Sequence, residues 1–271
     1  IMDRTEIVVL ETVGRDYALK SYQDCAAISN GITLGNDWKK SSLPWGTNLQ
    51  MYSDPFMTYF SGSRRRREQV MDRISAAGGA FCVDSAFEIL RGHRGDRPFT
   101  GLNHDVCMHA AEPLIRRSHT TGSLVAELDA SSGFRIFVTA GSSPCLTPFK
   151  PVLPLKMPAG VDQGGPRYSD DSYWWRHEAF RIQAEMRLTE VQGPLLKEIR
   201  ELEGQYCTNI PFSPWEGADR ALLSASEEAF FRSSALEASW LQAMKSMDRD
   251  ARPLHNAFWK SIARRNHVPF D

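Results

Sequence analysis

A segment rich in Pro and Gly, residues 144–166, separates two parts of the sequence that have different periodicities. The part before it contains short runs of β-branched or alternating apolar residues, which are typical of strands. The part after it carries apolar residues at helical intervals, as in the stretch SDDSYWWRHEAFRIQAEMRL that begins at Ser169. Strands early and helices late predict an α+β fold, with a core over residues 1–165 and a helical C-terminal part over residues 166–271 packed on the same domain.

Two hairpins are predicted in the first part. Residues 7–10 form an unbroken apolar run, which predicts a strand covered on both faces, and residues 16–23 alternate as its returning partner. The stretch at residues 120–140 contains two alternating runs around a turn at residues 129–133. Both hairpins join neighbouring segments of the chain, so antiparallel pairing is expected.

Cap and breaker residues set the expected helix boundaries. A loop is predicted over residues 31–57, ahead of the first helix. The other signals are Gly78-Gly79 after a helix over residues 63–77, the capping boxes Ser85/Glu88 and Ser224/Glu227, a break at Gly193-Pro194, and a last helix over residues 253–264.

Charge and cysteine content exclude several classes of function. The formal net charge of -1 argues against nucleic acid or an anionic membrane as the main partner. Five cysteines without regular spacing do not describe a disulfide framework and indicate a reducing compartment. No apolar run approaches the ~20 residues that a membrane-spanning helix needs. The prediction is a globular cytoplasmic protein, compatible with a homo-oligomer, that binds neither nucleic acid nor membrane.

Local clusters of reactive residues are interpreted structurally. In HDVCMHA, a strand would place Cys107 and His109 on one side and His104 on the other, so the three could not share one ion; a core strand and no metal site are predicted. GSSPC at residues 141–145 is interpreted as a turn, and RHE at residues 176–178 as a charged helix surface.

Six stretches, in order, resemble the secernin and dipeptidase family of N-terminal-nucleophile hydrolases. They are VLETVGRDYALK, DCAAISNGITLG, VCMHA, SHTTGSLVAEL, FVTAGSSPCLTPFKP and YWWRHEAF, and they extend from Val9 to Phe180. The resemblance implies an αββα four-layer sandwich and cysteine-dependent hydrolysis of dipeptides or other small C–N amide bonds. It implies a small peptide or amide substrate and no cofactor.

The nucleophile of such an enzyme is a cysteine at the N-terminus, whose α-amine, with a pKa near ~8, can act as the base. Residue 1 here is Ile1, and none of the five internal cysteines has a free α-amine. The resemblance therefore implies that the nucleophile and its neighbouring strands lie upstream, that the sandwich is incomplete in this chain, and that the 271-residue chain alone is inactive.

Four site residues are carried over or suggested by the resemblance. Asn30 in ISNG matches an asparagine whose amide stabilises the oxyanion, an interaction worth ~3 kcal/mol when well placed; Asn-Gly is also a common turn dipeptide. Arg64 opens the basic run at residues 64–67 and would favour a thiolate, although residues 64–67 point in four directions and a solvated helix start is the alternative. Thr120 and Thr121 would line the substrate groove, or serve only as strand formers.

Two alternatives to a dipeptidase remain open at this point. The same kind of site could serve an amidase or acyltransferase acting on N-acyl compounds, because only groove contacts distinguish the two. The protein could also be a non-catalytic, secernin-like binding or trafficking protein. The residue that occupies the nucleophile position discriminates between the enzyme and the binding protein.

Overall fold

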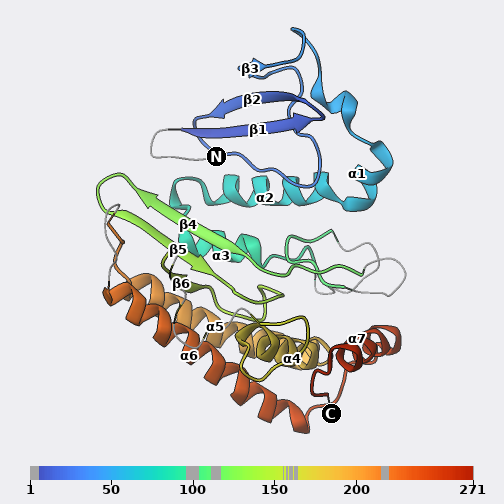
Figure 1. Cartoon of the computed structure of the whole chain (residues 1–271), viewed down its shortest axis with the longest axis vertical. Helices are drawn as coiled ribbons and strands as arrows, with labels where there is room; N and C mark the ends of the chain where they lie inside the picture. The colour runs from blue at the N-terminus through green and yellow to red at the C-terminus, as the bar shows by residue number, and fades with distance from the viewer. Residues whose placement is uncertain are drawn as a thin grey trace. The chain divides into compact units, whose positions relative to one another are not determined.

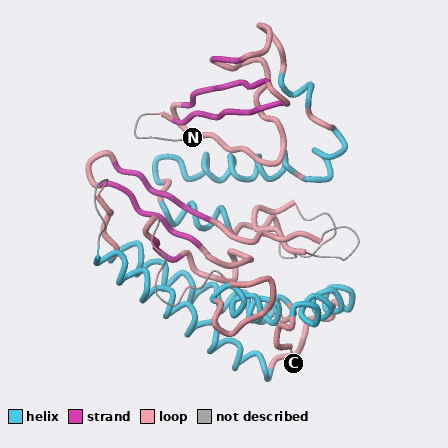
Figure 2. Tube along the Cα trace, viewed as in Figure 1, coloured by secondary structure: helices cyan, strands magenta, loops and turns pink. Residues whose placement is uncertain are grey.

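The computed structural model describes residues 6–95, 104–110, 117–154, 156, 158, 161, 164–214 and 220–270. It is a mixed α+β structure with two small antiparallel sheets, in the strand orders β1-β2-β3 and β4-β5-β6 (Figures 1 and 2). The chain forms two compact units. We call Ile1–Phe81 with Leu102–Val106 the N-terminal unit, and Cys82–Gly101 with Cys107–Asp271 the C-terminal unit.

The elements of the N-terminal unit are three strands, two helices and two short 3-10 turns. They are β1 (Ile7–Val13), β2 (Asp16–Tyr22), β3 (Lys40–Ser41), η1 (Leu49–Tyr52), α1 (Pro55–Ser61), α2 (Ser63–Ala77) and η2 (Gly78–Ala80). Those of the C-terminal unit are α3 (Val83–Leu90), β4 (Leu124–Asp129), β5 (Gly133–Val138), β6 (Lys150–Val152), α4 (Tyr173–Glu185), α5 (Leu188–Asn209), α6 (Arg220–Ala243), η3 (Met244–Ser246) and α7 (Pro253–Asn266).

The first predicted hairpin is confirmed. β1 and β2 pair in the register Val9↔Lys20 through Val13↔Asp16, around a turn in which Gly14 has φ 60. The expectation that β1 is covered on both faces is wrong, since Val9 is 8% exposed but Leu10 is 45% exposed. The reason is that this small core lies on one side of the sheet, where Val9 and Ala18 cluster with Leu34 and Leu49.

The predicted helix over residues 63–77 coincides with α2. The loop predicted over residues 31–57 is interrupted by α1, which begins at Pro55 because the Asp54 carboxylate accepts the N–H groups of Phe56 and Met57. An N-cap Asp followed by Pro is a strong helix start.

The second predicted hairpin is confirmed by β4 and β5, which pair from Leu124↔Val138 to Asp129↔Gly133. β6 adds to β5 inside the segment expected to be irregular, pairing Ile136↔Val152. Gly133 has φ 111, and a Cβ there would lie 1.9 Å from the carbonyl oxygen of Ser213, so glycine is required at this turn.

Three predicted helix boundaries are wrong. α3 begins at Val83 rather than after Ser85, because the N–H of Cys82 donates to the Ser85 hydroxyl. Ser224 lies inside α6 instead of capping it. Pro194 lies inside α5, and the break falls at residues 186–187, where the N–H of Asp250 donates to the Met186 carbonyl at 2.7 Å.

Helix α4 buries charged side chains, so the charged surface predicted at residues 176–178 is wrong for two of the three. His177 is 0% exposed and Glu178 is 4% exposed. Arg181 is fully buried as well and forms ion pairs with Glu178 at 2.7 Å and with Glu185 at 3.0 Å. The sequence pattern alone suggested that these charged groups are hydrated at the surface; in the structure, ion pairs with one another compensate for the loss of water.

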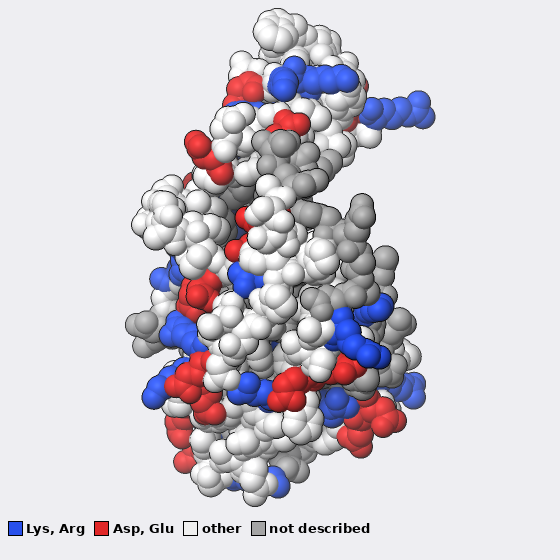
Figure 3. Space-filling model, turned by 90° about the vertical axis from the view of Figure 1, so that its left-hand side faces the viewer, with Lys and Arg blue, Asp and Glu red and all other residues white. Residues whose placement is uncertain are grey.

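Among the described residues on the face drawn in Figure 3, basic and acidic side chains are interspersed. Within the part of the chain that the structure describes, no helix is both long enough and apolar enough to cross a bilayer.

Candidate functional site

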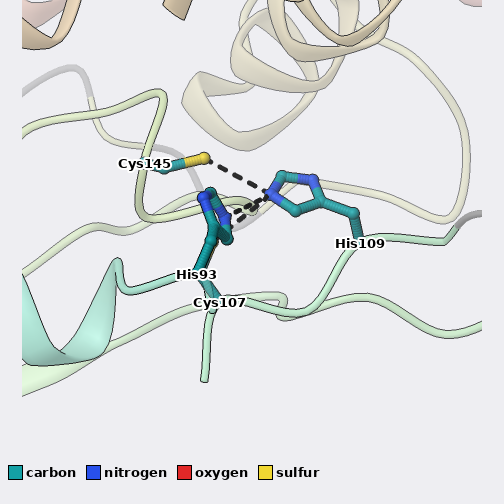
Figure 4. Close-up of side chains that lie close together, drawn as sticks. All are labelled: His93, Cys107, His109 and Cys145. Atoms are coloured by element: carbon teal, nitrogen blue, oxygen red, sulfur yellow. Dashed lines mark hydrogen bonds between the residues drawn. The ribbon is translucent and has the colours of Figure 1, made fainter. Parts of the chain in front are cut away.

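Four side chains from three separate segments of the C-terminal unit meet in one cluster, which we call the His/Cys cluster: His93, Cys107, His109 and Cys145 (Figure 4). Their potential ligand atoms all lie within 4.8 Å of one another. His109 Nε2 is 3.1 Å from His93 Nε2, 3.5 Å from Cys107 Sγ and 3.4 Å from Cys145 Sγ. His93 is partly buried and the other three residues are buried.

Backbone hydrogen bonds hold these segments in place. The Cys107 N–H donates to the Gly92 carbonyl at 3.2 Å, next to His93. Thr120 exchanges backbone and side-chain hydrogen bonds with Met108: its N–H donates to the Met108 carbonyl at 2.8 Å, and its hydroxyl accepts the Met108 N–H at 2.9 Å. Its own carbonyl accepts the N–H of Ser143 at 2.9 Å. Thr120 therefore connects the segment of Cys107 and His109 to the loop of Cys145.

The loop before Cys145 approaches α4 closely. A Cβ on Gly141 would lie 2.4 Å from His177 Cδ2, so glycine permits the contact. Ser143 has φ 56, in the left-handed region. Its hydroxyl donates to Glu185 Oε1 at 2.8 Å, which fixes this uncommon conformation and delivers Cys145 to the cluster.

Glu185 connects the cluster to the buried charges of α4. Its Oε1 lies 2.8 Å from His109 Nδ1, so the imidazole N–H donates to the carboxylate and Nε2 faces the sulfurs. Burial alone raises the pKa of Glu185, but Arg181 and His109 hold it well below its ordinary value. Burial lowers the pKa of His109, yet Cys107 and Glu185 together raise it to about 10.

The two thiols have opposite tendencies. Burial raises the pKa of Cys107, but hydrogen bonding from Cys145 and the charge of His109 bring it well below its ordinary value. Burial and the neighbouring Cys107 raise the pKa of Cys145 well above its ordinary value. Cys107, His109 and Glu185 thus have the connectivity of a nucleophile, a base and an orienting carboxylate. Cys107 is 0% exposed, however, so a substrate could not reach its sulfur without displacement of the surrounding segments.

The structure corrects the interpretation of HDVCMHA. Residues 104–110 form no strand, yet Cys107 and His109 do face one another, while His104 belongs to the N-terminal unit. Sequence reasoning missed His93 and Cys145 as members of the cluster. No local spacing connects them to Cys107, since they lie 14 residues before it and 38 residues after it (107 − 93 and 145 − 107).

A pocket of about 160 Å³ in the N-terminal unit includes two of the segments singled out in the sequence. Arg64 lines it, as do Ser29 and Gly31, the two neighbours of Asn30. Asn30 is exposed at the apex of a tight turn, in which the Gly31 N–H donates to the Ser29 carbonyl at 2.6 Å. The turn expected for Asn-Gly is therefore present, and it lies beside the basic start of α2.

Arg64 and Arg67 of α2 line this pocket, and Arg66 and Arg67 form hydrogen bonds with the segment before Asn30. Arg66 Nε donates to the Ser29 hydroxyl at 3.3 Å, and Arg67 Nε donates to the Ala27 carbonyl at 2.9 Å. These bonds hold the segment that leads to Asn30 against α2. Arg64 is exposed at the pocket wall, which leaves it accessible to an anionic group.

Thr120 and Thr121 belong to the C-terminal unit, whereas Asn30 and Arg64 belong to the N-terminal unit. Thr121 is exposed, whereas Thr120 is half-buried and forms the hydrogen bonds with Met108 and Ser143 described above. The substrate-binding role expected of both threonines stays a prediction, and for Thr120 the structure adds a positioning role beside the His/Cys cluster.

No family model, no curated protein and no solved structure matches this chain.

Proposed function

We propose that the protein is a cysteine-dependent hydrolase of small C–N amide bonds, with dipeptides as its first substrate class. The observation that carries the proposal is the pocket shared by Arg64 and the turn around Asn30. Arg64 lines this cavity, where a guanidinium would favour a thiolate, and we assign the oxyanion to the amide of Asn30, whose two chain neighbours line the same cavity. The six ordered stretches between Val9 and Phe180 support the same reaction class.

The reaction proceeds through a thioester. A thiolate attacks the carbonyl carbon, the side-chain amide of Asn30 donates to the developing oxyanion, and the C–N bond breaks as the leaving amine takes a proton. Water then attacks the thioester, releasing the acid and regenerating the thiol. Arg64 favours the thiolate over the thiol by its positive charge.

The mechanism needs an attacking thiol whose own α-amine can serve as the base. All five cysteines are internal, so none has the α-amine that serves as base in this mechanism. Two of them, Cys107 and Cys145, are also buried in the His/Cys cluster.

The test is a dipeptide and N-acyl substrate panel on the complete protein, with iodoacetamide-treated enzyme as the blank. Asn30→Ala should lower kcat by about 10²–10³-fold, the usual cost of one oxyanion donor. Arg64→Ala should also lower kcat, while Arg65→Ala, an exposed arginine on the same helix that does not line this pocket, is the matched control.

Full turnover by Asn30→Ala would remove this residue from the mechanism. If the Arg64 and Arg65 substitutions lower kcat equally, Arg64 contributes only its positive charge and has no specific role at the pocket. Absence of thiol-dependent hydrolysis across the whole panel would overturn the enzyme proposal in favour of a binding protein. Cleavage of N-acyl compounds alone would keep the mechanism and replace the substrate class.

A further inference from the structure

We infer that the His/Cys cluster binds a Zn²⁺ ion, with His93, Cys107, His109 and Cys145 as its four ligands. The inference is independent of the proposed hydrolase activity, because it concerns residues that the mechanism above does not use. It rests on the number, type, spacing and surroundings of the four side chains.

The spacing fits a tetrahedral ion. Zinc binds imidazole nitrogen at about 2.0–2.1 Å and thiolate sulfur at about 2.3 Å, which places neighbouring ligand atoms of a tetrahedron roughly 3.3–3.8 Å apart. The three distances from His109 Nε2, at 3.1, 3.5 and 3.4 Å, already lie near this range. All four ligand atoms lie within 4.8 Å of one another, so a shift of a few tenths of an ångström in each side chain completes the site.

The hydrogen bonds around the cluster orient both imidazoles for binding through Nε2. His109 is held by Glu185 at Nδ1, which is the carboxylate–histidine arrangement common around protein-bound zinc. His93 has its Nδ1 3.4 Å from the side-chain amide nitrogen of Gln192. With that amide turned so that its oxygen faces the ring, Gln192 accepts the Nδ1 proton and leaves Nε2 as the ligand atom.

Charge balance favours a divalent cation at this position. Two thiolates and two neutral imidazoles around Zn²⁺ give a net charge of zero, which suits a buried site. Two sulfur and two nitrogen ligands in tetrahedral array select zinc over Mg²⁺ or Ca²⁺, which prefer oxygen. Four protein ligands leave no open position, so the ion is structural. It would join three segments of the chain, of which the one around Cys107 contains no strand.

The first experiment measures metal in the native protein. Protein purified without chelator should contain one zinc per chain, as expected for a site with four protein ligands. Metal-free, reduced protein titrated with Co²⁺ should develop the intense visible bands of tetrahedral cobalt together with thiolate-to-cobalt charge transfer. Added zinc should displace the cobalt and abolish both signals.

Variants separate this site from other thiols. Cys145→Ser should lose the stoichiometric zinc and the sulfur charge-transfer intensity of one thiolate. Cys82→Ser is the matched control, since this exposed cysteine of the same unit lies outside the cluster. Gln192→Ala, which removes no ligand, should weaken zinc affinity about 10-fold with the tetrahedral cobalt spectrum retained.

Three results would overturn the inference. They are native protein without stoichiometric zinc that also gives no tetrahedral Co²⁺ spectrum, a Cys107–Cys145 disulfide in native protein by mass spectrometry, and equal zinc content in wild type and Cys145→Ser. The Gln192→Ala and Co²⁺ measurements keep the test decisive even if Cys145→Ser does not fold. A negative outcome leaves the hydrolase assay unaffected, because that assay reports on Asn30 and Arg64.

Discussion

Replacing Lys150 with Met should change how the stability of the protein depends on pH. Lys150 is a fully buried lysine whose Nζ donates to the Pro148 carbonyl at 2.8 Å and to the Thr147 hydroxyl at 3.2 Å. Burial lowers its pKa from 10.5 to about 7, although the charges of Glu237 and Glu203 act in the opposite direction.

The sign and size of the effect follow from proton linkage. Between about pH 7 and pH 10.5 the unfolded chain holds a proton on Lys150 that the folded protein has released. The unfolded state therefore binds more protons in this window, and the contribution of Lys150 to stability rises with pH. From pH 7 to pH 8.5 the rise amounts to roughly 1–2 kcal/mol, and most of the remainder falls between pH 8.5 and the ordinary lysine pKa.

The assay is denaturant unfolding of wild type and Lys150→Met at pH 7 and pH 8.5. Other groups of the protein also titrate in this window. Because such groups contribute to both proteins, the difference between wild type and variant isolates Lys150. That difference should shift by roughly 1–2 kcal/mol in favour of wild type at the higher pH.

Lys245→Met serves as the control, because Lys245 is an exposed lysine of the same unit. It should leave the difference from wild type constant over the two pH values. A constant difference for Lys150→Met as well would show that Lys150 keeps its proton in the folded protein, and the reasoning from burial would be wrong.

Two further pairs of substitutions each compare a residue in close contact with a matched control. Gly14→Ala should cost about 1–2 kcal/mol of unfolding free energy from left-handed strain alone, because φ is 60 and no atom lies within 4 Å of the new Cβ. Gly62→Ala should cost a further ~1–3 kcal/mol, because its Cβ would lie 1.6 Å from His104 Nδ1; equal losses in thermal or denaturant unfolding would contradict this contact. Thr120→Val removes the hydroxyl acceptor of a backbone N–H and should cost about 1–3 kcal/mol. The exposed Thr121→Val should stay within about 0.5 kcal/mol, and a larger loss there than at Thr120 would reverse the assignment.

The elements that the sequence predicted well are those encoded by local signals. Both hairpins turn at glycines with positive φ, Gly14 and Gly133, and α2 ends where Gly78 follows it. The helix break predicted at Pro194 is wrong because α5 accommodates the proline ring and its missing N–H. The actual break, at Met186, depends on a hydrogen bond from Asp250, which lies more than sixty residues further along the chain (250 − 186 = 64). A boundary that is set by a distant partner leaves no signal in its own window.

The candidate site follows the same division. Asn30 and Arg64 could be placed near one another from the resemblance, and the structure brings the turn of Asn30 to the pocket that Arg64 lines. The His/Cys cluster could not be assembled in this way. Cys107 and His109 are close in sequence, but His93 and Cys145 belong to other segments. Backbone hydrogen bonds of Gly92 and Thr120 hold those segments next to Cys107 and His109, and no periodicity in the sequence predicts these bonds.

The buried charges of α4 restrict how this chain can change over evolution. Arg181 is enclosed by Glu178 on one side and Glu185 on the other, and Glu185 also binds His109. Replacing Arg181 alone would leave Glu178 away from water without its ion-pair partner, at a typical cost of about 3–5 kcal/mol, whereas replacing the whole group by apolar residues need not be costly. We therefore expect homologous chains either to keep this whole set of charged residues or to replace its members together.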